Sequence, residues 1–99
     1  MTVEIRLRPE AEQDVVEAAL WYEEIESGLG AQFVDQVQAT INTIAEQPSA
    51  FTDIHKSPVR RALVRRFPFG VFYQIDKDGV MVIAVLHGSR HPRTWKDRP

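Results

Sequence analysis

Residues 80–95 read VMVIAVLHGSRHPRTW, and this stretch decides the predicted fold. Its first seven residues are all apolar and lack the alternation typical of a strand with one face in water. We therefore predict a strand over 80–87 that lies inside a sheet and has both faces covered. The strand gives way abruptly to cations, imidazoles and an indole, which are candidates for a functional surface: His87, Arg90, His91, Arg93 and Trp95.

The sequence before this strand predicts another strand and two helices. Residues 2–8 alternate apolar and polar side chains, which is typical of a strand with one buried face. Two apolar stripes with helical spacing follow, one over residues 9–26 and one from residue 29 to the proline at 48. We expect a helical hairpin whose stripes face a common core. The stripes consist of Ala11, Val15, Ala18, Tyr22 and Ile25, and of Leu29, Phe33, Val37, Ile41 and Ile44.

Residues 59–79 predict two further strands. We expect strands over VRRALVRRF (59–67) and VFYQID (71–76), joined by PFG, and a turn at Asp78-Gly79 before the last strand. The order β-α-α-β-β-β predicts an α+β fold, with a helical hairpin packed on one face of a small, mainly antiparallel sheet. The other face would be open unless a partner covers it. The length of 99 residues indicates a single domain over 1–99.

Composition excludes several classes of protein. There is no cysteine, which excludes disulfides and cysteine-bound metals, and no apolar run approaches the roughly 18 residues that span a bilayer. The charged amino terminus does not resemble a secretory signal, so we expect a cytoplasmic protein with no membrane contact. No phosphate-binding loop, nucleophile elbow or zinc-binding spacing of histidines occurs, so we expect neither a cofactor nor a metal.

Charge is divided unevenly along the chain. Residues 1–50 have a net charge of −8 and residues 51–99 a net charge of +6, which together give the overall −2. Two interpretations remain open for the arginines of 59–67. They either pair with helix carboxylates such as Glu23, Glu24 and Glu26, or they bind an anionic or nucleic-acid partner. We expect Arg61 or Arg65 to share a sheet face with the end of the last strand, beside His87.

Four segments together resemble the RelE/ParE superfamily of bacterial type II toxins. They are RLRPEAEQDVVEAALWYEE, GAQFVDQVQATINTIAEQP, VRRALVRRFPFGVFYQID and VMVIAVLHGSRHPRTW, and they cover nearly the whole chain. The resemblance implies a small growth-inhibiting toxin, of the kind that stabilises plasmids, neutralised by a cognate antitoxin. Such an antitoxin typically wraps the toxin and represses its own operon, so contact with operator DNA would be indirect.

The superfamily contains two mechanisms. RelE-like members cut mRNA on the ribosome, whereas ParE-like members inhibit DNA gyrase and are not known as nucleases. Aligned on FYQI, Arg61 and Arg90 resemble basic residues of the nucleases, but Leu63 and Gly70 stand where further cations are expected. Trp95-Lys96 occupies the region where nucleases often have Tyr or His. We therefore favour gyrase inhibition, without enzymatic activity.

The candidate residues depend on the mechanism. For target binding they are Arg61, Arg65, Arg90, Arg93 and Trp95, and for the alternative, a ribosome-dependent nuclease, the catalytic candidates are Arg61, Arg65, His87, Arg90 and His91. A second alternative is a degenerate toxin that only binds an antitoxin.

Overall fold

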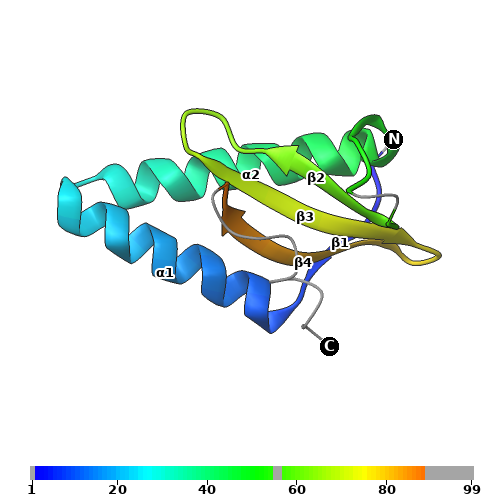
Figure 1. Ribbon diagram of the computed structural model, residues 1–99, viewed down its shortest axis with the longest axis horizontal. Helices are drawn as coiled ribbons and strands as arrows, with labels where there is room; N and C mark the ends of the chain where they lie inside the picture. The colour runs from blue at the N-terminus through cyan, green and yellow to red at the C-terminus, as the bar shows by residue number, and fades with distance from the viewer. Residues whose placement is uncertain (1, 55–56, 89–99) are drawn as a thin grey trace.

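The computed structural model describes residues 2–54 and 57–88, and it confirms the predicted order and the α+β class (Figure 1). Helices α1 and α2 lie side by side on one face of a four-stranded sheet. The elements are β1 (Ile5–Leu7), α1 (Pro9–Ile25), α2 (Leu29–Glu46), a short 3-10 turn (Pro48–Ala50), β2 (Val59–Leu63), β3 (Phe69–Asp76) and β4 (Gly79–His87). None of these helices is both long and apolar enough to cross a membrane.

The sheet has the strand order β1-β4-β3-β2. β1 pairs with β4 in parallel, and the other neighbours are antiparallel. β4 is therefore an interior strand, as its uninterrupted apolar sequence predicts. β1 is shorter than the predicted 2–8: its pairing with β4 is limited to Ile5–Leu7 against Val80–Val82.

A bulge in β4 explains why its sequence does not alternate. Tyr73 of β3 pairs with Val82, but Phe72 pairs with Ala84, so Ile83 is an extra residue. Val80 and Val82 before the bulge and Val85 after it belong to the core beneath the helices. The apolar side chains that face the opposite way form a second cluster with members of β2 and β4: Val59, Ile83, Ala84 and Leu86.

The sheet face opposite the helices, called the outer face here, is less open than predicted. Ile83, Ala84 and Leu86 are buried there, and Ile54 and Phe72 pack against them. The segment before β2 contributes to this packing because Thr52 and Ile54 form backbone hydrogen bonds with β2. The apolar sequence of β4 predicts that both faces of the strand are buried, but it does not predict that the segment before β2 covers part of the outer face.

The core beneath the helices contains a cluster of aromatic rings. Tyr22 and Phe33 have ring centroids 5.3 Å apart, and Phe67 and Phe69 join them at separations of 4.9 to 6.1 Å. Ile25, which the stripe placed in the core, is instead 58% exposed. The reason is visible in Figure 1, where the connection between the helices extends past the end of the sheet.

The connection between β2 and β3 differs from the prediction. β2 ends at Leu63, not at residue 67, and β3 begins at Phe69, inside the predicted connector. The backbone N–H of Val64 donates to Phe69 O at 2.9 Å, and this hydrogen bond closes a turn in which Arg66 has φ +71°. A positive φ is uncommon for a residue other than glycine. The turn is held because Val64 and Phe67 are buried on either side of Arg66.

Glu23 ties α1 to the start of α2. Its carboxylate accepts hydrogen bonds from the backbone N–H groups of Gly28, at 2.9 Å, and Gly30, at 3.0 Å. Gly28 has φ +90°, which glycine adopts without strain. Gly30 lies so close to α1 that an added Cβ would be 2.5 Å from Ala19 O. Among the described residues, the Glu23 carboxylate therefore stabilises the helical hairpin and does not pair with an arginine.

We predict that Gly30→Ala destabilises the protein by about 1–3 kcal/mol, because the methyl group would push the helices apart. Helix propensity alone predicts the opposite sign, a gain of about 1 kcal/mol. The control is Ala31→Gly at the exposed neighbouring position, which should also destabilise. Urea unfolding measures both changes, and a more stable Gly30→Ala protein would contradict the close contact.

The buried hydroxyl of Tyr73 should make the free energy of unfolding depend on pH in the alkaline range. The hydroxyl donates to Pro48 O at 2.6 Å, and burial raises its pKa above the usual 10.0. The stabilisation is therefore complete below pH 10 and is lost as the pH rises through the raised pKa of the folded state. Tyr73→Phe should cost about 1 kcal/mol at neutral pH and weaken the alkaline loss of stability. Urea unfolding across this pH range measures both effects.

Candidate functional site

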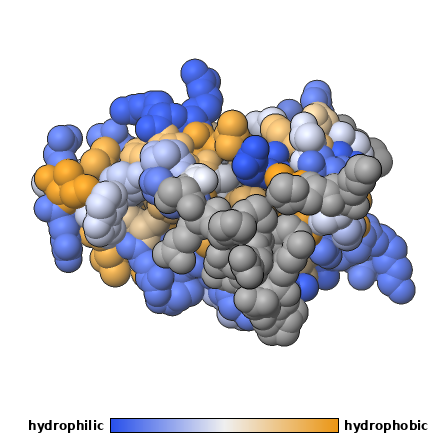
Figure 2. Space-filling model, viewed as in Figure 1, coloured by the Kyte–Doolittle hydropathy of each residue, from blue (hydrophilic) through white to orange (hydrophobic). Residues whose placement is uncertain are grey.

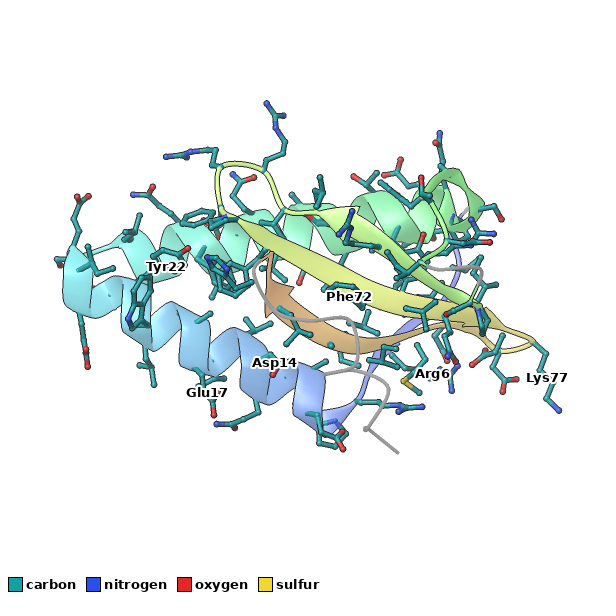
Figure 3. The ribbon with its side chains drawn as sticks, in the orientation of Figure 1. Arg6, Asp14, Glu17, Tyr22, Phe72 and Lys77 are labelled. Carbon is teal, nitrogen blue, oxygen red and sulfur yellow. The ribbon has the colours of Figure 1, made fainter. Side chains whose placement is uncertain are left out.

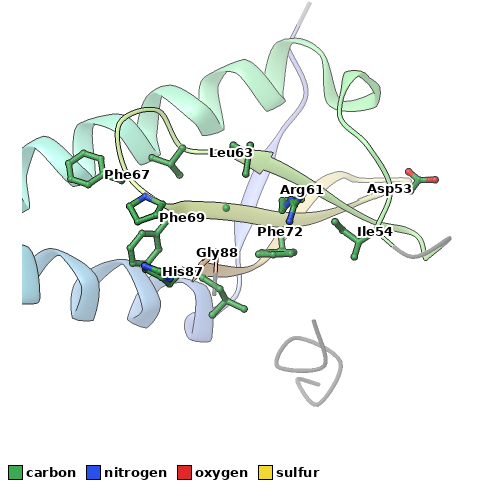
Figure 4. Close-up of a pocket in the computed structure, with 13 residues that line it drawn as sticks. Asp53, Ile54, Arg61, Leu63, Phe67, Phe69, Phe72, His87 and Gly88 are labelled. Atoms are coloured by element: carbon green, nitrogen blue, oxygen red, sulfur yellow. The ribbon is translucent and has the colours of Figure 1, made fainter. Parts of the chain in front are cut away.

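A hollow of about 510 Å³ lies on the outer face (Figure 4). The register places its central residues together: Arg61 of β2 pairs with Phe72 of β3, and Gly70 pairs with both Leu63 and Leu86. The cavity is called the hollow below. The residues that line it are Asp53, Ile54, Arg61, Leu63, Val64, Phe67, Pro68, Phe69, Gly70, Phe72, Leu86, His87 and Gly88.

Arg61 is the principal cation of the hollow. It is exposed, and within residues 2–54 and 57–88 it has neither an ion pair nor a hydrogen bond from its guanidinium. Gly70 makes room for its stem, since a Cβ there would be 3.0 Å from Arg61 Cγ. Figure 4 shows Arg61 beside Phe72 over the apolar floor. A guanidinium in this position is available to an anionic ligand.

The neighbouring Arg60 has a structural role. Its Nη1 donates to Phe51 O at 2.5 Å and to Ser49 O at 3.3 Å, and it lies 3.2 Å from Asp53 Oδ1. Because successive side chains of a strand point to opposite faces, Arg60 is on the helix side while Arg61 is on the outer face. Arg60 therefore fixes the segment that follows α2.

Arg65 and Arg66 are in the β2–β3 turn rather than in a strand, which corrects their predicted location. Both are exposed, and hydrophilic residues project above this turn in Figure 2. Arg66 Nη2 donates to Gln32 Oε1 at 3.3 Å. Arg65 does not line the hollow, so of the two arginines proposed to share this face with the last strand, Arg61 does so.

Pairing of these arginines with helix carboxylates does not occur within the described ranges. Arg60 pairs instead with Asp53, and Arg6 pairs with Asp76 at 2.6 Å. The Arg6–Asp76 pair lies at the other end of the sheet, near Lys77 (Figure 3). Hydrogen bonding by Arg6 lowers the pKa of Asp76 below its usual range. The acidic helices are therefore not the partners of Arg61.

His87 ends β4 at the rim of the hollow. Its ring centroid is 5.4 Å from that of Phe69, in an edge-to-face arrangement. His87 also makes at least one further interaction. The remaining candidates, Arg90, His91, Arg93 and Trp95, lie outside the described residues. In the described part of the chain, no group of three or more acidic or imidazole side chains could hold a metal ion.

Sequence reasoning missed the apolar part of the site. Leu63, Phe72 and Leu86 surround Arg61, but their common face depends on the register and on the bulge in β4. The sequence contained one signal of this face: Gly70 and Phe72 are two residues apart in β3, so both face the same side of the sheet. Among the described residues, this surface places the guanidinium of Arg61, which none of them pairs, over apolar side chains, and such a surface suits binding of an amphipathic anion better than proton transfer.

Comparisons with known proteins identify the family. A family model described as the ParE toxin of the type II toxin–antitoxin system parDE matches residues 5–92. The chain belongs to this ParE toxin family. It is thus a toxin of a type II toxin–antitoxin system. None of the curated proteins matches this ParE-family chain in sequence.

Two solved structures have a similar fold. A chain of the chromosomal ParDE system from P. aeruginosa matches with a TM-score of 0.79 and 11% identity, over 87% of this chain and 96% of that one. A chain of the RelBE2 toxin–antitoxin complex from Mycobacterium tuberculosis matches with a TM-score of 0.60 and 15% identity, over 88% of this chain and 99% of that one. These likenesses support the fold of the ParE-family chain.

The two adjacent arginines of β2 should respond differently to mutation. Arg60→Ala should lower the free energy of unfolding by about 1–3 kcal/mol, because it leaves the carbonyl oxygens of Ser49 and Phe51 without their donor. Arg61→Ala should change it by less than about 0.5 kcal/mol, as is usual for exposed residues. Thermal and urea unfolding test this pair, and an equal loss in both variants would contradict the division of roles.

Proposed function

We propose that this toxin inhibits DNA gyrase and that a cognate antitoxin neutralises it in the cytoplasm. The observation that carries the proposal is the exposed Arg61 on the outer face of a chain whose family is named for the ParE toxin. A cation that no described carboxylate neutralises is suited to an anionic surface of a large partner. The proposed functional unit is one domain over residues 1–99.

The proposed target-binding surface extends from the hollow to the β2–β3 turn. Arg61 and Arg65 are its described members, and both are exposed. Arg90, Arg93 and Trp95 remain proposed members from the sequence. Contact with operator DNA is proposed to occur only through the antitoxin.

The alternative is a ribosome-dependent endonuclease with catalytic groups among Arg61, Arg65, His87, Arg90 and His91. Cleavage by a ribose 2′-hydroxyl requires a base, an acid and stabilisation of developing charge. Within the described part of the hollow, Arg61 could stabilise charge and His87 lies at the rim with its ring against Phe69, but Asp53 is paired with Arg60 and most other lining residues are apolar. This composition favours binding over cleavage. A degenerate toxin that only binds antitoxin is the second alternative.

A supercoiling assay tests the gyrase proposal. Purified toxin in modest molar excess should block supercoiling of relaxed plasmid, and the double variant Arg61→Glu/Arg65→Glu should need at least about tenfold more protein, because its charges repel an anionic surface. The control is Lys77→Glu, the same reversal in the β3–β4 turn at the opposite end of the sheet (Figure 3). It should inhibit like the unmodified protein.

The other mechanisms give different results. Normal supercoiling, together with new mRNA 5′ ends inside translated codons that Arg61→Ala abolishes, would replace gyrase inhibition with nuclease activity. Normal supercoiling with intact mRNA and unimpaired growth on expression would leave only the antitoxin-binding module.

A further inference from the structure

We propose that Gly70 is a positioning residue for Arg61. The missing side chain at position 70 lets the arginine stem cross β3 there, and this contact holds the guanidinium over the hollow, where an anionic group of the target binds. The inference rests on the proposed function for the identity of that target, DNA gyrase. The positioning itself is a property of the toxin alone, because Gly70 acts through Arg61 and touches no partner.

The strand register makes Gly70 a diagonal neighbour of Arg61. Arg61 pairs with Phe72, and Gly70 lies two residues before Phe72 on the same face of β3. Diagonal neighbours in a sheet are about 7–8 Å apart, which a long side chain can reach. The Arg61 stem does so, since its Cγ and Cδ would be 3.0 and 3.1 Å from a Cβ at position 70. The stem therefore occupies the space that a side chain of residue 70 would fill.

The backbone does not require glycine at position 70. Gly70 has no positive φ, and it is paired on both sides, with Leu63 of β2 and Leu86 of β4. Glycine weakens such a strand, because it has no side chain to pack and loses more conformational freedom on folding than other residues. A glycine inside a strand often marks a place where another group approaches closely. At Gly70 this group is the stem of Arg61.

The contacts of Gly70 differ from those of a glycine that the fold requires. A Cβ at Gly30 would meet the backbone oxygen of Ala19, which cannot move unless the helix moves. A Cβ at Gly70 would meet the flexible side chain of Arg61, and its next neighbour, Phe72 Cε1, would be at an ordinary contact distance of 3.5 Å. A larger residue at position 70 would thus displace the arginine stem and leave the backbone in place.

A stem that is held in the free protein makes binding through Arg61 more favourable. Ordering a rotamer-rich side chain on binding weakens affinity by roughly two- to twelvefold. The contact with Gly70 meets part of this cost within the fold, while the guanidinium beside Phe72 stays available to a partner (Figure 4). Loss of the contact should therefore weaken target binding, but less than loss of the guanidinium itself.

Gly70→Val tests the inference in the supercoiling assay. Valine is favoured in strands, so the variant should fold while its side chain displaces the Arg61 stem. Inhibition should require roughly two- to twelvefold more protein, and Arg61→Ala should require more still. The matched control is Gln74→Val, which lies outside the hollow on the same face of β3, beyond Phe72 and away from the stem. It should inhibit like the unmodified protein.

The double variant Gly70→Val/Arg61→Ala separates positioning from damage to the fold. It has no stem to displace, so it should inhibit like Arg61→Ala alone. Urea unfolding gives the same comparison without gyrase: Gly70→Val should be less favourable for stability in the unmodified protein than in the Arg61→Ala protein. Equal effects of Gly70→Val in the two proteins, in either measurement, would overturn the proposal.

NMR relaxation tests the positioning in the unmodified protein. The heteronuclear NOE of an arginine Nε–H group reports side-chain motion on the ps–ns timescale. It should be higher for Arg61 than for Arg65, which is exposed in the β2–β3 turn. In Gly70→Val, or in Gly70→Ala if the valine variant does not fold, the Arg61 value should fall toward that of Arg65. Equal values in the unmodified protein would contradict the positioning role.

The NMR measurement and the supercoiling assay distinguish this inference from the proposed function. If Gly70→Val frees Arg61 and weakens inhibition, both stand. If Gly70→Val frees Arg61 but the unmodified toxin does not inhibit gyrase, the proposed function fails and the positioning stands. If the toxin inhibits gyrase and Gly70→Val either leaves Arg61 ordered or inhibits like the unmodified protein, the positioning role fails.

Discussion

The bulge in β4 determines which residues face the helices and which form the outer face. Before it, Val82 points into the main core; after it, Val85 does so, and Ala84 and Leu86 are left for the outer cluster. Asp14 of α1 stabilises this arrangement, since its carboxylate accepts the Val85 N–H at 2.9 Å where β1 no longer pairs with β4 (Figure 3). A strand without the extra residue would exchange the two faces beyond this point. The main core and the floor of the hollow therefore depend on the same local irregularity.

Two neighbouring arginines show how one strand serves both stability and binding. Arg60 meets two carbonyl oxygens and a carboxylate around the segment after α2, so its charge is used within the fold. Arg61 lies over Gly70 and Phe72 on the other face, where the described residues supply no carboxylate. An exposed ion pair there would add at most about 1 kcal/mol to stability. Leaving Arg61 unpaired therefore costs the fold little, while it keeps a guanidinium available for a partner.

The sequence predicted the elements well because their signals are local. The helical stripes, Pro9 and the uninterrupted apolar run of β4 each identified an element, and the interior position of β4 followed from its pattern. The errors arose where tertiary contacts decide: Phe67 was read as strand, but its burial among Tyr22 and Phe33 closes a turn instead. Arg61 was identified as a candidate, whereas the contrast with Arg60 was not. That contrast depends on where the segment around Asp53 folds, and residue order alone does not contain this information.

A surface that combines exposed apolar side chains with Arg61, whose guanidinium no described residue pairs, favours mutually exclusive ligands. Covering Leu63 and the floor of the hollow stabilises a complex by about 25 cal/mol for each Å² of apolar area removed from water. A carboxylate against Arg61 adds specificity, because the guanidinium is desolvated when the apolar contacts form and must then have a partner. A ligand that covers the hollow thus necessarily occupies Arg61. If two partners both require this guanidinium, they compete for one side chain without any conformational change in the toxin, and their relative affinities and concentrations decide which is bound.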